Sequence, residues 1–264
     1  MQNFICRYFL LIGLLGSTYA QTQGKETIVI ETAFGNMKLK LFEETPLHKA
    51  NFLKLVKDKF FDSLMFHRVI NNFMIQGGDH LSKFAKAGDS LGHGDIGYSV
   101  PAEFNRKIIH KKGRLCAARE SDDINPEKAS SASQFYIVMG KKRTMEDLAK
   151  YEDRINKTYY SNCDRDFKKT TEGKGLKQSY DKLIRENKQD SAMLIKTTIE
   201  DRVKSLYLKT PEYKFNQYQI DTYLSVGGTP HLDGTYTVFG ELIEGIDVID
   251  KIAAVETDKR NRPI

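Results

Sequence analysis

FHRVINNFMIQGGD, residues 66–79, is the stretch that decides the fold. It reads as two short strands, 66–70 and 73–76, followed by a Gly-Gly pair that lets the backbone turn. The same stretch places Arg68 and Gln76 among large apolar side chains. Arginine keeps its proton in proteins and presents its N–H donors in a rigid fork. The stretch therefore indicates a fixed cation beside an apolar pocket.

Strand patterns extend outward from this segment in both directions. Residues 26–32 and 37–42 alternate between apolar and polar side chains, and the turn at 33–36 between them completes a hairpin signature. Thr45 fits an N-cap and Pro46 the first position of a helix, which we expect to follow. Further strands are expected at 108–118, 134–138 and 236–240, a glycine-rich loop at 88–97 and a helix at 246–252.

The character of the chain changes between residues 143 and 223. Charge density rises, and apolar residues from Leu176 to Leu206 recur at helical spacing, as one long helix or two shorter ones. Shorter helices are expected at 145–155 and 213–223. We interpret 143–223 as a helical insertion in one β-rich domain made of 26–142 and 224–264. Two tandem domains would leave the last strand and helix without a sheet.

The first twenty residues have the pattern of a secretory signal peptide. Arg7 is followed by an apolar run at 9–16 and by small residues at Thr18 and Ala20, so we expect cleavage after Ala20 and a linker at 21–25. An uncleaved anchor is the alternative, but the apolar run is short for a bilayer. We expect a mature protein outside the cytoplasm, periplasmic or secreted, without stable membrane insertion.

The composition is that of an ordinary soluble protein, with 264 residues, 40% of them hydrophobic and 29% charged. The net charge of +6 is spread along the chain without a basic block, which excludes a nucleic-acid footprint. Cys116 and Cys163 are expected to be free thiols rather than a disulfide. Cys and His are not spaced as zinc ligands, so we expect no metal, and nothing indicates an organic cofactor.

Three blocks of sequence together resemble the cyclophilin-type peptidyl-prolyl cis-trans isomerases. They are residues 66–79, residues 125–137, which contain Asn125-Pro126 and end in Ser133-Gln134-Phe135-Tyr136-Ile137, and residues 232–240. The resemblance covers about 28–143 and 227–263 and skips the insertion. It implies an eight-stranded antiparallel barrel capped by two helices.

The resemblance also implies the site residues. Arg68 and Gln76 are the predicted catalytic residues, since Arg68 matches the catalytic arginine and Gln76 matches the glutamine that hydrogen-bonds the substrate backbone. The remaining matches are proposed to bind substrate: the pocket walls Phe73, Met74, Tyr136 and Leu232, the flanking His67 and Gln134, the peptide-pairing segment Ala118 and Arg119, and the further site positions His231 and Tyr236.

The chain departs from the family pattern at several positions. His231 stands where tryptophan is common, Ala117 where a larger methionine is common, and Tyr236 where histidine is common. The family usually continues with one more strand, which pairs with the first. Either this chain, which stops at Ile264, is truncated, or its barrel closes differently.

The sequence thus favours a peptidyl-prolyl isomerase that assists protein folding outside the cytoplasm, with proline-containing polypeptides as substrates. In this interpretation Arg68 donates to the prolyl nitrogen or to the adjacent carbonyl as the X-Pro amide twists. Two alternatives remain open. One is a non-catalytic module that binds proline-containing segments. The other is a chaperone that acts through the helical insertion.

Overall fold

One curled antiparallel sheet organises the fold. The computed structural model describes residues 27–209 and 211–264. Its strands are β1 (Thr27–Thr32), β2 (Gly35–Leu41), β3 (Arg68–Ile70), β4 (Met74–Gly77), β5 (Ser99–Val100), β6 (Arg114–Ala117), β7 (Ser130–Ser131), β8 (Phe135–Val138) and β9 (Val238–Glu244). Seven strands form the main sheet in the order β1-β2-β9-β6-β8-β4-β3, and β5 pairs with β7 in a small second sheet.

The register of the central strands separates the core from the candidate site. In the β3–β4 hairpin Arg68 lies opposite Gln76 and Val69 opposite Ile75, and β8 continues this order by pairing Tyr136 with Gln76. Successive side chains of a strand point to opposite faces of a sheet. Val69 and Ile75 therefore enter the core, while Arg68, Gln76 and Tyr136 share the other face.

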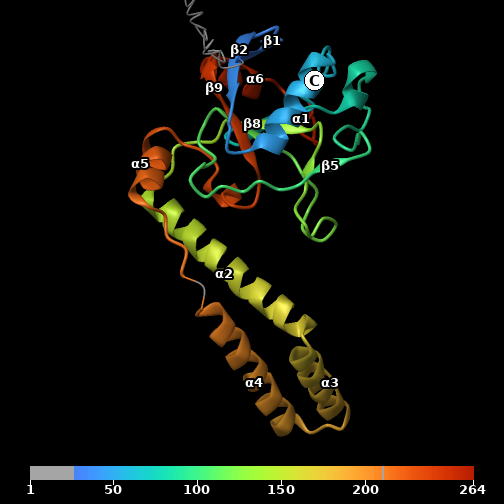
Figure 1. Ribbon diagram of the computed structural model, residues 1–264, viewed down its shortest axis with the longest axis vertical. Coiled ribbons are helices and arrows are strands. Elements are labelled where there is room, and N and C mark those ends of the chain that lie inside the picture. The colour runs from blue at the N-terminus through green and yellow to red at the C-terminus, as the bar shows by residue number, and fades with distance from the viewer. Residues whose placement is uncertain (1–26, 210) are drawn as a thin grey trace, which may run out of the picture.

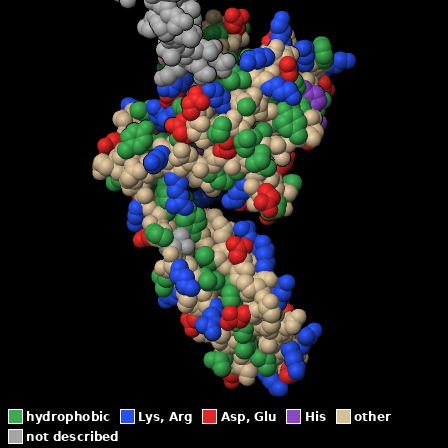
Figure 2. All heavy atoms as spheres, in the orientation of Figure 1, with side chains coloured by type: hydrophobic (Ala, Val, Ile, Leu, Met, Phe, Trp, Pro, Cys, Tyr) green, Lys and Arg blue, Asp and Glu red, His purple; other side chains and the backbone are tan. Residues whose placement is uncertain are grey.

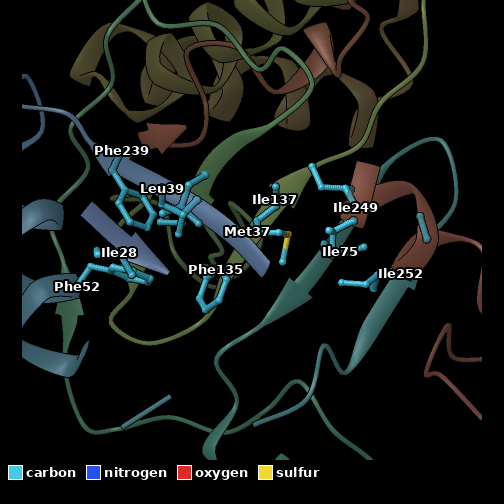
Figure 3. Packing of buried hydrophobic residues seen from close by; sticks show 14 of the residues in the cluster. Ile28, Met37, Leu39, Phe52, Ile75, Phe135, Ile137, Phe239, Ile249 and Ile252 are labelled. Carbon is cyan, nitrogen blue, oxygen red and sulfur yellow. The ribbon is translucent and has the colours of Figure 1, made fainter. Parts of the chain in front are cut away.

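The core lies on the concave face of the sheet and is closed by two helices, α1 (Pro46–Lys57) and α6 (Ile246–Ala253). Figure 3 shows apolar side chains of the strands converging with Phe52 of α1 and with Ile249 and Ile252 of α6. Ile75 and Ile249 have no exposed surface. Burying each such side chain contributes about 1.5–3 kcal/mol, so this core fixes the strands that carry the site.

The start of α1 differs from the sequence-based expectation. Thr45 occupies the N-cap position, but its side chain makes no capping hydrogen bond. The carboxylate of Glu103 accepts the N–H groups of Leu47 and His48 instead, each at 3.0 Å, and also contacts the His48 ring at 2.6 Å. Although burial raises it, these hydrogen bonds hold the pKa of Glu103 below its usual value. A distant carboxylate thus replaces the local cap.

The strand expected at 108–118 is shorter than predicted. The N–H of Arg114 closes a turn on the carbonyl of Lys111 at 3.2 Å, so β6 begins only at Arg114. The predicted hairpin at 26–42, the strand pair at 66–76, the strand at 134–138 and the helix at 246–252 are confirmed within a residue or two.

A helical arm projects from the sheet (Figure 1). It is built from α2 (Met145–Lys169), α3 (Thr171–Arg185) and α4 (Gln189–Tyr207), and α5 (Gln217–Ser225) lies at its base. The apolar residues from 176 to 206 thus form two helices rather than one, because the chain turns at Asn187, whose φ is +57°. Figure 2 shows acidic and basic side chains interspersed along the arm, and pairs such as Lys150–Glu146 join successive turns.

The two ends of this helical region meet at one point of the sheet. Lys141 and Gly228 form an isolated antiparallel bridge, in which the N–H of Gly228 donates to the carbonyl of Lys141 at 3.1 Å. A Cβ at Gly140 would lie 2.4 Å from the Cα of Gly228, so the crossing has no room for a side chain. The chain therefore enters and leaves the inserted helices at this tightly packed crossing of 140–141 with Gly228, which we call the neck.

The mainly β fold class with inserted helices is confirmed, but the main sheet has seven strands rather than eight. Within the described residues β1 and β3 are its edges and do not pair, which makes it a half-barrel. The carbonyl of Asn261 accepts the N–H of Val69 at 2.7 Å, so the C-terminal segment lies along β3. The exact domain boundaries stay a prediction.

Two further expectations concern the termini and the thiols. The signal peptide and linker predicted at 1–25 lie outside the described residues. None of the described helices combines the length and apolar character that crossing a bilayer requires. Cys116 is buried, Cys163 is half-buried, and both are free thiols, as expected.

Candidate active site

The candidate site is centred on a chain of hydrogen bonds across three strands or their ends. Arg68 donates through Nη1 to Oε1 of Gln76 at 3.2 Å, and Gln76 donates through Nε2 to Oε1 of Gln134 at 3.0 Å. The Nε2 of Gln134 in turn donates to the carbonyls of Gly92 and Gly94 at 3.1 and 3.0 Å. This chain fixes the orientation of the guanidinium plane and of both amides.

The guanidinium of Arg68 keeps donors available for a ligand. Arginine has five N–H donors, of which one reaches Gln76, and no carboxylate pairs with Arg68 within the described residues. Burial lowers the pKa of Arg68, yet an arginine remains protonated throughout the physiological range. The site therefore holds a positioned, half-buried cation with unused N–H groups.

An apolar pocket adjoins this cation. We use "apolar pocket" for the side chains of Phe73, Met74, Tyr136 and Leu232, which line a groove of about 670 Å³ together with Arg68 and Gln76. Met74, Tyr136 and Leu232 are buried, with Cys116 and Val238 packed beneath them. The groove thus offers apolar walls of fixed shape beside one charged donor.

Tyr136 places a buried hydroxyl among the apolar side chains of the pocket. Its ring packs edge-to-face on Tyr236 at 6.1 Å and lies nearly parallel to the His110 ring at 6.3 Å. Burial raises the pKa of Tyr136 and of the neighbouring Cys116 well above their usual values. Both groups are therefore neutral, and neither supplies a base to the groove.

Arg119 supports Tyr236. Its guanidinium lies 4.4 Å from the centroid of the Tyr236 ring, and its Nε donates to the carbonyl of Thr235 at 2.9 Å. Asp122 pairs with Nη1 at 2.8 Å. The side-chain charge of Arg119 is thus used within the protein.

The segment predicted to pair with an extended peptide is already partly paired. The N–H of Ala118 donates to the carbonyl of Gln134 at 3.0 Å, and its carbonyl accepts from the N–H of Ser131 at 2.8 Å. Within the described residues the main-chain groups of Arg119 make no hydrogen bond. Of this segment, the backbone N–H and carbonyl of Arg119 are therefore the groups left to hydrogen-bond an extended peptide.

His67 and Asp79 shape the glycine loop that faces the groove. Both ring nitrogens of His67 are buried without a partner in the described residues, and burial is the main cause that lowers its pKa, so the ring is neutral. Asp79 accepts the N–H groups of Gly92 and Leu81 at 2.5 and 2.8 Å. Although burial raises it, these bonds hold the pKa of Asp79 below its usual value.

The groove brings together eleven of the twelve residues predicted for the site, and His231 is the exception. The His231 ring lies behind Phe73, at 5.6 Å between ring centroids, and contacts Tyr151 of α2 on its other side at 5.7 Å. The structure thus places His231 against a wall of the pocket and not on the groove surface. The assigned roles of all twelve residues stay predictions.

Sequence reasoning missed three kinds of groove residue. Gly92 and Gly94 belong to the glycine-rich loop expected at 88–97, which was given no role in the site, yet their carbonyls hold Gln134. Arg260 and Arg262 reach the groove because the Asn261 carbonyl fixes the C-terminal segment on β3. Tyr98 also lines the groove, and no short-range sequence pattern marks Tyr98, Arg260 or Arg262 as groove residues.

The chain is similar to several known proteins. The sequence model of the family described as "Cyclophilin type peptidyl-prolyl cis-trans isomerase/CLD" matches residues 27–159 and 154–264. The chain is 29% identical over 240 residues to a putative bifunctional phosphatase/peptidyl-prolyl cis-trans isomerase of Streptococcus pyogenes, and the match covers 89% of the chain but only 36% of that relative.

A second relative matches along most of its length. It is a putative peptidyl-prolyl cis-trans isomerase of Staphylococcus aureus, 26% identical over 243 residues, with 92% of the chain and 88% of the relative covered. Among solved structures, a Cryptosporidium parvum cyclophilin-type isomerase crystallised in the presence of the dipeptide Ala-Pro aligns with a TM-score of 0.49 and 18% identity, over 90% of this chain and 92% of that one.

Proposed function

Because the chain belongs to the cyclophilin-type peptidyl-prolyl cis-trans isomerases, we propose that its groove accelerates rotation about X-Pro bonds in polypeptides that fold outside the cytoplasm. The observation that carries the proposal is the placement of Arg68, oriented by Gln76, beside the apolar pocket. The pocket suits a pyrrolidine ring, and the cation suits the amide next to it.

The reaction requires no bond to be made or broken. The partial double bond of an X-Pro amide gives a barrier of about 18–20 kcal/mol, and uncatalysed rotation takes about tens to hundreds of seconds. An enzyme accelerates it only by binding the twisted amide more tightly than either planar form. In the twisted state the prolyl nitrogen becomes pyramidal and regains a lone pair, which a positioned N–H donor stabilises.

Different residues of the groove bind the proline ring, bind the adjacent backbone and stabilise the twisted amide. Phe73, Met74 and Leu232 hold the proline ring, and Gln76 holds the adjacent backbone, so the carbonyl side of the amide is free to rotate. Arg68 then donates to the prolyl nitrogen as the lone pair develops. The hydrogen bond to Gln76 orients the guanidinium before the substrate binds, so little reorganisation is needed in the transition state.

The extracytoplasmic part of the proposal is supported by the sequence pattern at 1–20. It is tested by expressing the full chain with a C-terminal tag, separating the cell fractions and sequencing the N-terminus of the product. Cleavage after Ala20 and recovery outside the cytoplasm are expected. A full-length protein in the cytoplasmic fraction would refute the assignment.

The catalytic part is tested with the purified mature chain and a short peptide that contains one X-Pro bond. The rate of cis-to-trans conversion should rise in proportion to enzyme concentration. No acceleration at micromolar enzyme, with the peptide still bound, would favour a non-catalytic proline-binding module instead.

A second candidate function, holding of unfolded polypeptides by the arm, is favoured by exposed apolar side chains on α4. Met193 and Leu194 are 59% and 69% exposed. An aggregation assay with a denatured client protein, run beside the isomerase assay, separates the two functions. Replacement of both side chains by serine should weaken only the suppression of aggregation.

A further inference from the structure

A column of three rings connects the apolar pocket with the inserted helices. Phe73 lines the groove, His231 stacks on it at 5.6 Å with an angle of 25° between the ring planes, and Tyr151 stacks on His231 at 5.7 Å and 22°. Tyr151 belongs to α2, the first helix of the arm. A side chain of the insertion therefore lies two rings from the space that a proline ring would fill.

The loop that carries His231 and Leu232 is also held by residues near the neck of the arm. Arg143 donates through Nη2 and Nε to the carbonyl of Gly228 at 2.8 and 3.1 Å, and its guanidinium lies 5.6 Å from the centroid of the Tyr151 ring. On the other side the hydroxyl of Tyr223 donates to Asp233 at 2.6 Å. Contacts from both ends of the insertion thus converge on this loop.

We propose that Tyr151 is a positioning residue for the isomerase site, which fixes the Phe73 wall and the loop that carries Leu232 by holding the His231 ring between Phe73 and α2. The proposal rests on the proposed function. Tyr151 does not line the groove, and it acts through His231. Without its ring, one face of His231 loses its contact, and the Phe73 wall loses its support.

The charge state of His231 provides a direct readout of this contact. Burial, together with the nearby Arg154, His110 and Arg143, lowers the pKa of His231 to about 4, while Asp233 acts in the opposite direction. The ring between Phe73 and Tyr151 is therefore neutral at physiological pH. Removal of the Tyr151 ring admits water to one face, so the pKa of His231 should rise toward the ordinary value of about 6.5.

The experiment compares three variants of the mature chain: Tyr151→Ala, Tyr151→Phe and Tyr160→Ala. Tyr160 is the matched control, because it also lies on α2 and packs on an aromatic ring, that of Tyr207 at 5.6 Å, away from the column. Each variant is measured for kcat/KM on a proline peptide and for the pKa of His231 by NMR titration of the ring protons. Circular dichroism checks the fold.

Loss of one ring contact should lower kcat/KM of Tyr151→Ala by about threefold to tenfold. Tyr151→Phe keeps the ring, and Tyr160→Ala leaves the column intact, so both should stay within about twofold of the parent. The pKa of His231 should rise only in Tyr151→Ala. If that variant unfolds more easily than the parent, Tyr151→Leu replaces it, since leucine keeps apolar volume without a stacking face.

Two results would overturn the inference. One is an unchanged kcat/KM in Tyr151→Ala, and the other is an equal loss in Tyr151→Phe or Tyr160→Ala. An inactive parent chain would refute the proposed function instead. The NMR titration separates the two cases, because an identical His231 pKa in Tyr151→Ala and in the parent contradicts the contact itself, whatever the activity.

Discussion

Replacement of Arg68 by alanine is the most direct perturbation of the proposed reaction. The guanidinium is half-buried, is oriented by one hydrogen bond to Gln76 and has no carboxylate partner in the described part of the chain. Removing one preorganised donor from an active site costs about 2.7–4 kcal/mol of transition-state stabilisation. Because Arg68 is partly accessible to water, we expect the lower end, which corresponds to a loss of about a hundredfold in kcat.

The same geometry predicts little change in substrate affinity. Phe73, Met74 and Leu232 still form the apolar pocket after the replacement, so KM should stay within about threefold of the parent value. The assay follows a peptide with one X-Pro bond whose cis form resists a protease, and NMR exchange measurements without a protease provide an independent rate.

Two controls make this experiment decisive. Arg68→Lys keeps the charge but loses the planar fork, so its activity should lie between those of the parent and Arg68→Ala. Arg185→Ala removes an exposed arginine at the end of α3 and should change nothing. A kcat for Arg68→Ala within threefold of the parent, with the fold intact, would refute the assigned role of the cation.

Four further predictions concern the pH dependence of activity, the pH dependence of stability, the cap of α1 and the arm. The value of kcat/KM should be flat from pH 6.5 to 9, because Arg68 stays charged and burial keeps the pKa of His67 low. Since the pKa of His231 falls to about 4 on folding, the unfolded state binds more protons below pH 6.5, and the thermal midpoint should fall as pH drops from 6.5 toward 4. Glu103→Ala removes the cap of α1 and should lower the free energy of unfolding in urea by about 1–2 kcal/mol. Glu43 is exposed and pairs with Lys49, so the control Glu43→Ala should lower it by less than about 0.5 kcal/mol. Equal effects of the two replacements would contradict the role of Glu103 as the cap. Replacement of residues 158–211 by a short Gly-Ser linker should leave isomerase activity within about twofold of the parent. The base of the arm stays joined, because Asn156 accepts the N–H of Tyr213 at 2.8 Å and donates to the carbonyl of Tyr213 at 3.1 Å. A tenfold loss of activity would show that the distal arm supports the site.

Much of the fold could be predicted because alternation within each strand is a local property. Val69 and Ile75 alternate with Arg68 and Gln76, and this pattern alone assigns core and site to opposite faces. The three sequence blocks supply the walls of the apolar pocket, with Met74 from β4, Tyr136 from β8 and Leu232 from the helical turn Pro230–Leu232.

The features that the sequence did not reveal all depend on distant partners. Thr45 has the residue type of an N-cap, but Glu103 supplies the hydrogen bonds after the chain returns to α1. His231 matched a substrate-binding position, yet α2 covers it with Tyr151. No pattern within a short window specifies which side chain arrives from elsewhere, so such contacts require the tertiary structure.

The neck at Lys141 and Gly228 is a point at which another folded domain could be inserted into this chain. Since the chain leaves and re-enters through one β-bridge, the length of the segment between these points imposes no strain on β8 or β9. A foreign domain whose own termini lie close together could replace the distal helices, provided that Gly140 and Gly228 are kept, because their crossing admits no side chain. A ligand-binding module joined to α2 beyond Tyr151 would then be attached to the helix whose ring contacts His231.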